Sequence, residues 1–514
     1  MSTDPMLQPF DEHNRKLASH VHPEDWTPPE PADRYHLVVI GAGTAGLVSA
    51  AIAASLGARV ALVERHLMGG DCLNVGCVPS KGLISAARAW HGARRAGERF
   101  AGPAAEGDGD FGAMMERMRR LRADISHVDG AARFRDLGVD VFFGHGRFVA
   151  GDTVEVDGKR LRFRRAVIAT GGRAVAPPID GLADVPYLTN ETLFSLTELP
   201  RRLGVIGGGP IGCEMAQAFA RFGSEVTLLN RSAHVLPRED EDAARIVENA
   251  MRSDGIGIVG GVEVGKVGRD GDETLIQTTG SKETGSEETG FNETEHRVDR
   301  LLVAVGRKPN VEDLGLEAAG VEYGPKGIQV DDRLRTTNKN IFAAGDVASR
   351  FQFTHTADAQ ARLLIRNAFF FGRGKMSSLV VPWCTYTSPE IAHVGLFAHD
   401  AEQRGFAVET LTLPFEDVDR ALLDGESEGF LRVHLKKGTD RILGGTLVAA
   451  HAGDMIGPLA LAATHGWGVS KFSSTIFPYP TQGEAYRKIG DLYNRRRLTS
   501  TTRKIFDLWF KWLG

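Results

Sequence analysis

Two stretches of the chain place apolar runs and glycine-rich turns in the same order. Residues 36–64 read as an apolar β run, a glycine-rich turn, an alanine-rich helix and a second β run that ends in Glu64. Residues 203–230 repeat this order and end in Asn230. A buried β run that feeds a glycine turn and a helix is typical of dinucleotide-binding α/β domains. The pattern therefore predicts two such units in one chain.

The turn of the first unit has the spacing G-x-G-x-x-G. Gly41 allows the tight turn, Gly43 lets the backbone approach a pyrophosphate, and Gly46 lets the helix pack on the strand. The phosphates would sit at the start of the helix, beside Thr44. Glu64, at the end of the second β run, is placed to bind a ribose hydroxyl.

The second unit repeats the glycines as Gly207, Gly209 and Gly212, but it lacks the terminal acid. Asn230 stands in its place and is followed by Arg231, with Arg238 further along. An acid would favour the free ribose of NADH, whereas arginine suits the 2′-phosphate of NADPH. We therefore expect NADPH, with NADH as the alternative if Arg231 is only a solvated turn residue.

Two cysteines lie close together in residues 69–81, GGDCLNVGCVPSK. On a straight helix, Cys72 and Cys77 would be separated by a rise of about 7.5 Å, and a disulfide needs Cα atoms about 4.4–6.8 Å apart. The pair can close only if the backbone leaves the helix, which Gly76 permits. A following helix N-terminus and Lys81 would lower a thiol pKa. Two unpaired cysteines on a glycine-rich loop are the alternative.

This thirteen-residue stretch resembles the redox-active disulfide of the class I flavin-dependent pyridine nucleotide–disulfide oxidoreductases. The resemblance implies that Cys77 is the charge-transfer thiolate facing the flavin and that Cys72 is the interchange thiol that meets the acceptor. It also implies that Glu214 pairs with Lys81 beside the flavin. The two dinucleotides would be a tightly held FAD at the first unit and a diffusible NADPH at the second.

The resemblance implies an α/β fold with two Rossmann-like, glutathione-reductase-type dinucleotide-binding domains and a C-terminal α+β dimerisation domain, hence a homodimer. The expected division is an N-terminal extension (1–35), a discontinuous FAD-binding domain (36–180 and 301–378), an NAD(P)H-binding domain (181–300), a dimerisation domain (379–498) and an amphipathic tail (499–514). We expect the extension to be packed on the surface or mobile. The polar, acidic stretch 270–298 should be a surface hairpin or a flexible loop.

Further positions that resemble family residues at the dinucleotides are Gly70, Asp71, Lys81, Gly146, Thr170, Gly171, Gly306, Asp346, Gln352, Phe353, Thr354 and His355. Asp346 would bind the ribityl or phosphate region of the flavin, and it could also cap the next helix. Residues 352–355 match a helix start under the flavin ring, where the helix dipole would stabilise negative charge on the reduced flavin.

The C-terminal motif PYPTQGEAYRK, residues 478–488, departs from the thiol reductases of the family. These carry histidine where Tyr479 stands here, while Glu484 matches their orienting glutamate. An unperturbed tyrosine, with a pKa near 10, is a poor general base. The chain is more similar to the mercuric reductase branch, although its C-terminus lacks that branch's cysteine pair. The expected acceptor is Hg(II) or another soft species. The alternatives are a disulfide (dihydrolipoyl dehydrogenase-like) or quinone reductase, and a redox-responsive binding protein.

Composition and charge restrict the partners and the cell compartment expected for this chain. The net charge of −5 argues against nucleic acid as a partner. Four cysteines are too few for a secreted disulfide framework and favour a reducing cytoplasm. Cys384 and His393 are interpreted as packed, structural residues, and no metal site is expected. The aromatic tail could pack on its own dimer, or it could dock to a membrane surface or a partner.

Overall fold

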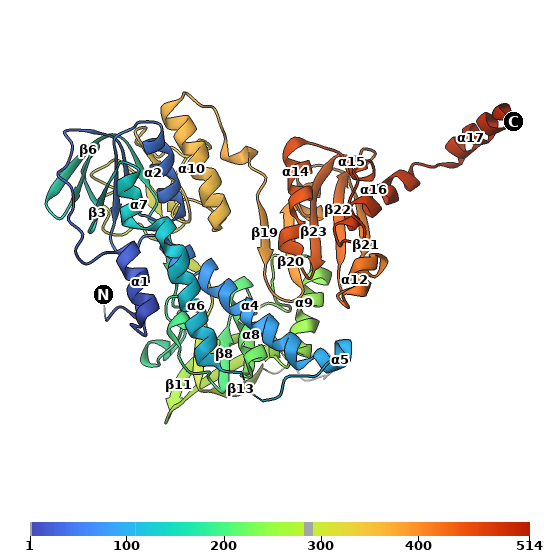
Figure 1. The fold of residues 1–514 in the computed structure, drawn as a ribbon, viewed down its shortest axis with the longest axis horizontal. Helices are drawn as coiled ribbons and strands as arrows, with labels where there is room; N and C mark the ends of the chain where they lie inside the picture. The colour runs from blue at the N-terminus through green and yellow to red at the C-terminus, as the bar shows by residue number, and fades with distance from the viewer. Residues whose placement is uncertain (1–2, 108, 282–290) are drawn as a thin grey trace.

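The computed structural model describes residues 3–107, 109–281 and 291–514. Figure 1 shows three bodies: a sheet domain around β3 and β6 with α2 and α10, a second sheet domain around β8 and β11 below it, and a third around β19–β23. In the described residues, no helix is both long enough and apolar enough to cross a membrane.

The first domain is a seven-stranded sheet with order β3-β2-β1-β6-β5-β4, and β18 pairs with β6. Strands β1, β2, β3, β6 and β18 pair in parallel, and β4 and β5 extend the sheet antiparallel. The first nucleotide motif runs through β1, α2 and β2. Helices α2 and α10 pack against each other on this domain. The bounds are β1 Tyr35–Ile40, α2 Thr44–Ser55, β2 Val60–Glu64, β3 Val139–Phe143, β4 Arg147–Ala150, β5 Thr153–Val156, β6 Lys159–Ile168, β18 Ile341–Ala343 and α10 Thr354–Phe369.

The second domain repeats the arrangement with a parallel sheet of order β10-β9-β8-β14. Its strands and helices are β8 Arg202–Ile206, α8 Pro210–Phe222, β9 Glu225–Asn230, α9 Glu241–Ser253, β10 Gly257–Gly260 and β14 Arg300–Val303. The expected boundary at residue 301 was wrong, because β14 pairs in parallel with β8 and so completes the second sheet. The chain returns to the first domain only afterwards, through β15 Arg307–Pro309, which pairs with β7 Gly172–Ala174.

The stretch expected as a hairpin or a loop joins a three-stranded antiparallel sheet. Its strands are β11 Val262–Asp270, β12 Glu273–Ser281 and β13 Phe291–Val298, in that order. β12 and β13 pair antiparallel from Thr274↔Val298 to Ser281↔Phe291, so these strands form a hairpin. Residues 282–290 of the predicted loop lie outside the described residues.

The third domain is a five-stranded antiparallel sheet with order β19-β20-β23-β22-β21. Helices α14 and α16 pack on it, and α17 follows as a separate helix that points away from the rest of the chain (Figure 1). The bounds are β19 Pro382–Thr385, β20 Glu390–Gly395, α11 Ala398–Gln403, β21 Val408–Pro414, α12 Asp419–Leu423, β22 Phe430–Lys436, β23 Ile442–Ala449, α13 Ala452–Met455, α14 Gly457–His465, α15 Ser470–Ser473, α16 Glu484–Arg496 and α17 Ser500–Leu513.

The N-terminal segment is packed rather than mobile. It forms α1 (Glu12–Val21), and Leu7, Leu17 and Val21 are fully buried in the core of the first domain. Between β2 and β3 the chain forms five helices, α3 Gly70–Asn74, α4 Cys77–Arg94, α5 Ala96–Phe100, α6 Phe111–Ser126 and α7 Ala131–Asp136.

One arginine ties this segment to the cysteine-bearing residues. Arg122 on α6 is almost fully buried. Its guanidinium donates to the Asn74 carbonyl at 2.6 Å and to Asn14 Oδ1 at 2.6 Å. Burial lowers the pKa of Arg122 to about 10, so the group stays charged at neutral pH. The end of α3 is thereby fixed to α1 through one buried cation.

Candidate functional site

A cavity of about 950 Å³ lies where the three domains meet. Its walls come from the first glycine turn, the cysteine segment, the loop after β14, the turn after β18 and the start of α10. The start of α8 and residues of β19 complete it, so both nucleotide units reach this space. Its volume is at the upper end of the range for ligand sites.

Most residues expected at the site from the sequence line this cavity. They are Gly41, Gly43, Thr44, Glu64, Gly70, Asp71, Cys72, Cys77, Lys81, Gly146, Thr170, Gly171, Glu214, Arg238, Asp346, Gln352, Phe353, Thr354 and His355. Those that do not line it are Gly46, Gly207, Gly209, Gly212, Asn230, Arg231, Gly306, Tyr479 and Glu484.

The backbone leaves the helix between the two cysteines, as their spacing requires. α3 ends at Asn74, and α4 begins at Cys77, with Gly76 at φ −134° and ψ −117° between them. A Cβ at Gly76 would lie 2.7 Å from the Asp71 carbonyl oxygen, so only glycine fits there. Both sulfurs are free thiols in this structure, and the expected disulfide is not formed.

The two thiols differ sharply in acidity. The pKa of Cys77 is lowered to about 6, and the largest cause is the hydrogen bond donated by the Cys72 thiol. The Thr354 hydroxyl and the Lys81 ammonium contribute to this lowering, and burial opposes it. The same hydrogen bond, together with burial, raises the pKa of Cys72 well above its ordinary value. At neutral pH the reduced pair therefore holds one thiolate, at Cys77, and one proton, at Cys72.

Two helix N-termini meet at Cys77. The residue opens α4, and its Sγ lies 3.5 Å from the Thr354 hydroxyl, which opens α10. In neither helix does a side chain of the N-cap residue accept a hydrogen bond from the first backbone N–H groups. The partial positive charge of both helix ends favours an anion here. Asp346 lies in the turn after β18 and does not cap α10, whose N-cap is Phe353.

An ion pair joins the cysteine helix to the second unit. Lys81 Nζ on α4 donates to Glu214 Oε2 on α8 at 2.8 Å. The other carboxylate oxygen of Glu214 accepts from the Tyr386 backbone N–H at 2.9 Å, and Lys81 Nζ lies 4.5 Å from the centre of the Tyr386 ring. The buried Glu214 thus connects all three domains at the cavity wall.

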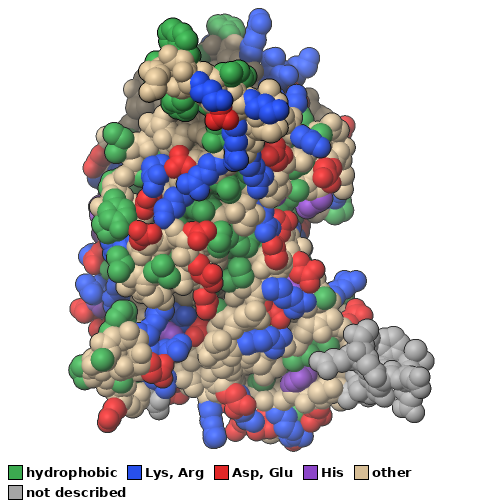
Figure 2. All heavy atoms as spheres, turned by 90° about the vertical axis from the view of Figure 1, so that its right-hand side faces the viewer, with side chains coloured by type: hydrophobic (Ala, Val, Ile, Leu, Met, Phe, Trp, Pro, Cys, Tyr) green, Lys and Arg blue, Asp and Glu red, His purple; other side chains and the backbone are tan. Residues whose placement is uncertain are grey.

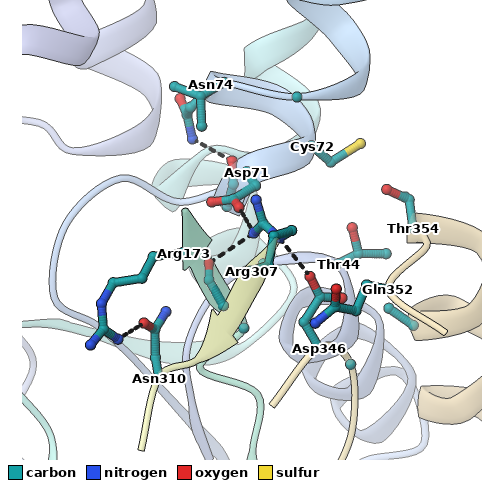
Figure 3. Close-up of a pocket in the computed structure, with 18 of the residues that line it drawn as sticks. Thr44, Asp71, Cys72, Asn74, Arg173, Arg307, Asn310, Asp346, Gln352 and Thr354 are labelled. Carbon is teal, nitrogen blue, oxygen red and sulfur yellow. Dashed lines mark hydrogen bonds and ion pairs between the residues drawn. The ribbon is translucent and has the colours of Figure 1, made fainter. Parts of the chain in front are cut away.

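Sequence reasoning missed Arg307, which lies in the cavity wall between two expected flavin ligands. Its guanidinium contacts the Asp71 carboxylate, donates to the Gly172 carbonyl at 2.9 Å, and lies 3.6 Å from Asp346 Oδ2 (Figure 3). Burial raises the pKa of Asp346, and Arg307 opposes that shift. The sequence feature that could have revealed Arg307 is the charged run R-K-P-N, residues 307–310, which follows a buried strand.

The first glycine turn has the space and the donors for a dinucleotide. Gly41 has φ +100°, and a Cβ at Gly46 would lie 1.8 Å from the Gly41 carbonyl oxygen. A Cβ at Gly43 would have nothing nearer than Gly70 Cα at 3.7 Å, so the open space there is left for a ligand. Glu64 accepts from the Ala42 N–H at 2.6 Å and shapes the turn. These residues fit the pyrophosphate and ribose of FAD.

The second glycine turn is built in the same way. Gly207 has φ +114°, and a Cβ at Gly212 would lie 1.9 Å from the Gly207 carbonyl oxygen, whereas nothing is within 4 Å at Gly209. Asn230 is buried, and its Nδ2 donates to the carbonyls of Ser232 and His234. Its amide thus holds the loop that carries Arg231 and Arg238, both exposed. Among the described residues, neither guanidinium has an ion-pair partner.

The C-terminal motif lies away from the cavity of its own chain. Tyr479 is 69 % exposed, and its hydroxyl donates to Asp419 Oδ2 at 3.0 Å, which raises the pKa of Tyr479. Glu484 is buried and contacts Arg487. Neither residue lines the cavity, so within one chain the structure does not bring them to Cys72.

The two residues interpreted as structural are packed in the third domain. The Nδ1 atom of His393 lies 2.8 Å from the Thr446 hydroxyl, and its ring stacks on Phe397. Burial lowers the pKa of His393 to about 3, so it stays neutral. Cys384 lines the cavity, but burial raises the pKa of its thiol well above the ordinary value. A neutral thiol is a weak nucleophile.

These features define a class of protein. The chain matches the pyridine nucleotide-disulphide oxidoreductase family over residues 35–361 and the dimerisation domain of that family over residues 381–489. It therefore belongs to this family of oxidoreductases, which use FAD with NAD(P)H, and its third domain supports a homodimer. The predicted family, fold class and enzyme class are confirmed.

The relatives of this chain include mercuric reductases and a dihydrolipoyl dehydrogenase. The chain is 36 % identical to a mercuric reductase of Bacillus cereus over 489 residues, which cover 94 % of this chain and 75 % of that one. It is 38 % identical to a mercuric reductase of Streptomyces lividans, covering 88 % and 95 %. It is 30 % identical to a dihydrolipoyl dehydrogenase of Bacillus subtilis, covering 88 % and 97 %.

Solved structures agree with the fold. The HOCl-induced flavoprotein disulfide reductase RclA from Escherichia coli superposes with a TM-score of 0.78 at 29 % identity, covering 89 % of this chain and 100 % of that one. A Cu(II) complex of the same protein gives a TM-score of 0.76 at 29 % identity, covering 88 % and 98 %.

Proposed function

We propose that this flavoprotein reductase uses NADPH to reduce Hg(II), or another soft acceptor, through Cys77 and Cys72. The proposal rests on the difference in pKa between the two thiols, which leaves a thiolate at Cys77 and a proton on Cys72. Both lie in a cavity that the two nucleotide units reach. FAD, when bound, would take a hydride from the nicotinamide and pass two electrons to the sulfur pair.

Side chains of the cavity would stabilise the thiolate and hold the proton that this electron transfer requires. Cys77 would lie on the flavin side, because the two helix ends and Lys81 favour its anion. Cys72 would keep its proton until an acceptor arrives and then engage it. Glu214 would keep Lys81 in place, since it is buried and bonded to both Lys81 and Tyr386.

The tyrosine at position 479 favours a soft metal ion as the acceptor. A soft metal ion binds thiolates directly and needs no general base with a pKa near neutrality. Tyr479, whose pKa is raised further by Asp419, suits such an acceptor better than a disulfide, which needs proton transfer. The reaction balances as NADPH + Hg²⁺ → NADP⁺ + H⁺ + Hg⁰. Mercuric reductases among the relatives support this choice.

The preference for NADPH rests on the arginines that follow the second unit. Arg231 and Arg238 are exposed and lack carboxylate partners among the described residues, so they are free to bind a 2′-phosphate. In the homodimer, Tyr479 and Glu484 of the partner subunit would complete the acceptor site near Cys72. The reaction would take place in the cytoplasm, where thiols stay reduced.

An acceptor screen on the purified holoenzyme tests the proposal. Steady NADPH oxidation with Hg(II) and excess thiol is expected, and Cys72→Ser and Cys77→Ser should each lower it by about a thousand-fold. Cys384→Ser is the matched control and should keep full activity, because its thiol is neutral.

Other outcomes identify the alternatives. Turnover with disulfides or quinones but not with Hg(II) would make the protein a disulfide or quinone reductase. Its acceptor would then resemble that of the relatives named dihydrolipoyl dehydrogenase and flavoprotein disulfide reductase. Flavin reduction by NADPH without multiple turnover on any acceptor would point to a redox-responsive binding protein.

A further inference from the structure

The last helix of the chain has a wide apolar face that the rest of the chain leaves uncovered. α17 (Ser500–Leu513) begins with a capped turn, in which the Thr499 hydroxyl accepts from the Thr502 N–H. It contains no buried residue, and it projects from the third domain (Figure 1). Its large apolar side chains are 46–74 % exposed: Ile505, Phe506, Leu508, Trp509, Phe510, Trp512 and Leu513.

The apolar and polar side chains of α17 lie on opposite faces. At 100° per residue, the seven apolar side chains occupy an arc of about 200°. Ser500, Arg503, Lys504, Asp507 and Lys511 occupy the remaining arc, and Thr501 and Thr502 of the first turn fall within the apolar arc. By contrast, α16, which precedes it, buries Tyr486 and Ile489 against the sheet of the third domain. The uncovered face therefore belongs to α17 alone.

Cations surround this apolar face. Arg495 and Arg496 end α16, Arg497 follows it, and α17 adds Arg503, Lys504 and Lys511; of these, Arg496 pairs with Glu409 at 3.4 Å. The only acidic side chain from residue 495 to residue 513 is Asp507, although the whole chain has a net charge of −5. Figure 2 shows the side of the molecule on which α17 projects, where Lys and Arg are interspersed with hydrophobic side chains. The positive charge of this end is a local feature.

We infer that α17 docks the enzyme to an anionic lipid surface. A basic helix with an aromatic apolar face lies in the plane of a membrane interface, with its apolar face among the acyl chains. At about 21 Å, α17 is too short to span a hydrocarbon core of about 30 Å. Phe and Trp supply four of its seven apolar side chains, as is typical of interfacial helices.

A second copy of the chain fits this helix less well. A helix–helix seam uses two positions of seven, whereas the apolar face of α17 spans more than half of its circumference. Pairing would leave much of the face in water and would bring two groups of cations together. A lipid surface with negative headgroups covers the whole face and neutralises the cations.

Vesicle flotation of the full-length holoenzyme tests the inference. The protein should float with phosphatidylcholine vesicles that contain about a quarter phosphatidylglycerol and should stay unbound with phosphatidylcholine alone. Trp509→Ser/Trp512→Ser should lower binding to the anionic vesicles by more than about ten-fold, because two interfacial aromatic groups are lost. Lys504→Gln and Lys511→Gln should each weaken it by about five-fold.

The controls separate folding and self-association from lipid binding. Deletion of residues 500–514 should abolish flotation and leave NADPH-dependent flavin reduction unchanged, because these residues bury nothing. Absence of flotation for the full chain, or equal flotation of the deletion variant, would overturn the inference. A smaller oligomer by sedimentation after the deletion, without flotation of the full chain, would assign the face to a second copy instead.

Discussion

The two nucleotide units share the same strand, glycine turn and helix, yet their surroundings differ. The turn of the first unit, at Gly41–Gly43, forms the wall of the deep cavity, and Glu64 beside it is buried and satisfied by backbone amides. The glycines of the second unit lie outside the cavity, and its neighbouring arginines are exposed. We propose that the same motif serves two purposes in this chain. Enclosure suits a cofactor that stays, and an open rim suits one that exchanges.

The largest expected effect comes from the second glycine of the first turn. Gly43→Ala adds a methyl group where the protein leaves space, so the chain should fold, but the group would meet a bound pyrophosphate. We expect protein with little flavin and activity reduced by more than about a hundred-fold. Flavin absorbance per protein measures this directly. A fully flavinated Gly43→Ala enzyme would contradict the assignment of the first unit to FAD.

Gly209→Ala is the matched change in the second unit and should have a smaller effect. Its methyl group also meets nothing within 4 Å. We expect a normal flavin content and a KM for NADPH about ten-fold higher, which corresponds to a loss of about 1.4 kcal/mol. Reduction by dithionite should be unaffected. If Gly209→Ala lost flavin instead, the roles of the two units would be reversed.

Removing the arginines that follow the second unit should change the choice of nicotinamide. Arg231→Ala and Arg238→Ala should each lower kcat/KM for NADPH by about five-fold, because a charge-assisted bond to the 2′-phosphate is lost. The value for NADH should stay the same. Steady-state kinetics with both cofactors measure the ratio, and a parallel loss for both would mean that the arginines do not recognise the 2′-phosphate.

The smallest expected effect is a change in the pKa of Cys77, which lies in the cavity that both units reach. In a Cys72→Ser variant the hydroxyl still donates to Cys77, so the thiolate should persist above a pKa of about 6 and be lost as the pH falls through it. Cys72→Ala removes the donor, the largest cause of the shift, and should raise that pKa. The long-wavelength absorbance of the thiolate beside oxidised flavin follows both titrations. Identical titrations of the two variants would contradict the role of the Cys72 donor.

Local patterns predicted the two nucleotide units and the break between the cysteines, whereas the start of α10 was expected from the family resemblance. Each is encoded within about thirty residues, because glycine spacing and apolar runs act through the local backbone. The contacts of Arg307 and Arg122 could not be predicted in this way. Arg307 joins Asp71 to Asp346, and Arg122 joins Asn74 to Asn14, all distant in sequence.

The domain boundary near residue 301 shows the same limit. The apolar run at 301–305 has the pattern of a buried parallel strand, but the pattern does not say which sheet the strand joins. Its pairing with β8 is decided by tertiary packing. The place of Asn230 was likewise predicted from spacing, whereas its bonds to the loop carbonyls depend on how that loop folds back.

The most direct test of the account is a count of thiols after anaerobic reduction by NADPH. The oxidised holoenzyme is reduced with one equivalent of NADPH, denatured in the presence of an alkylating reagent, and mapped by mass spectrometry. The account predicts that label appears newly at Cys72 and Cys77 together, while Cys213 and Cys384 are labelled equally before and after reduction. NADPH that bleaches the flavin while Cys72 and Cys77 stay unlabelled, or labelled to the same extent as before, would contradict it.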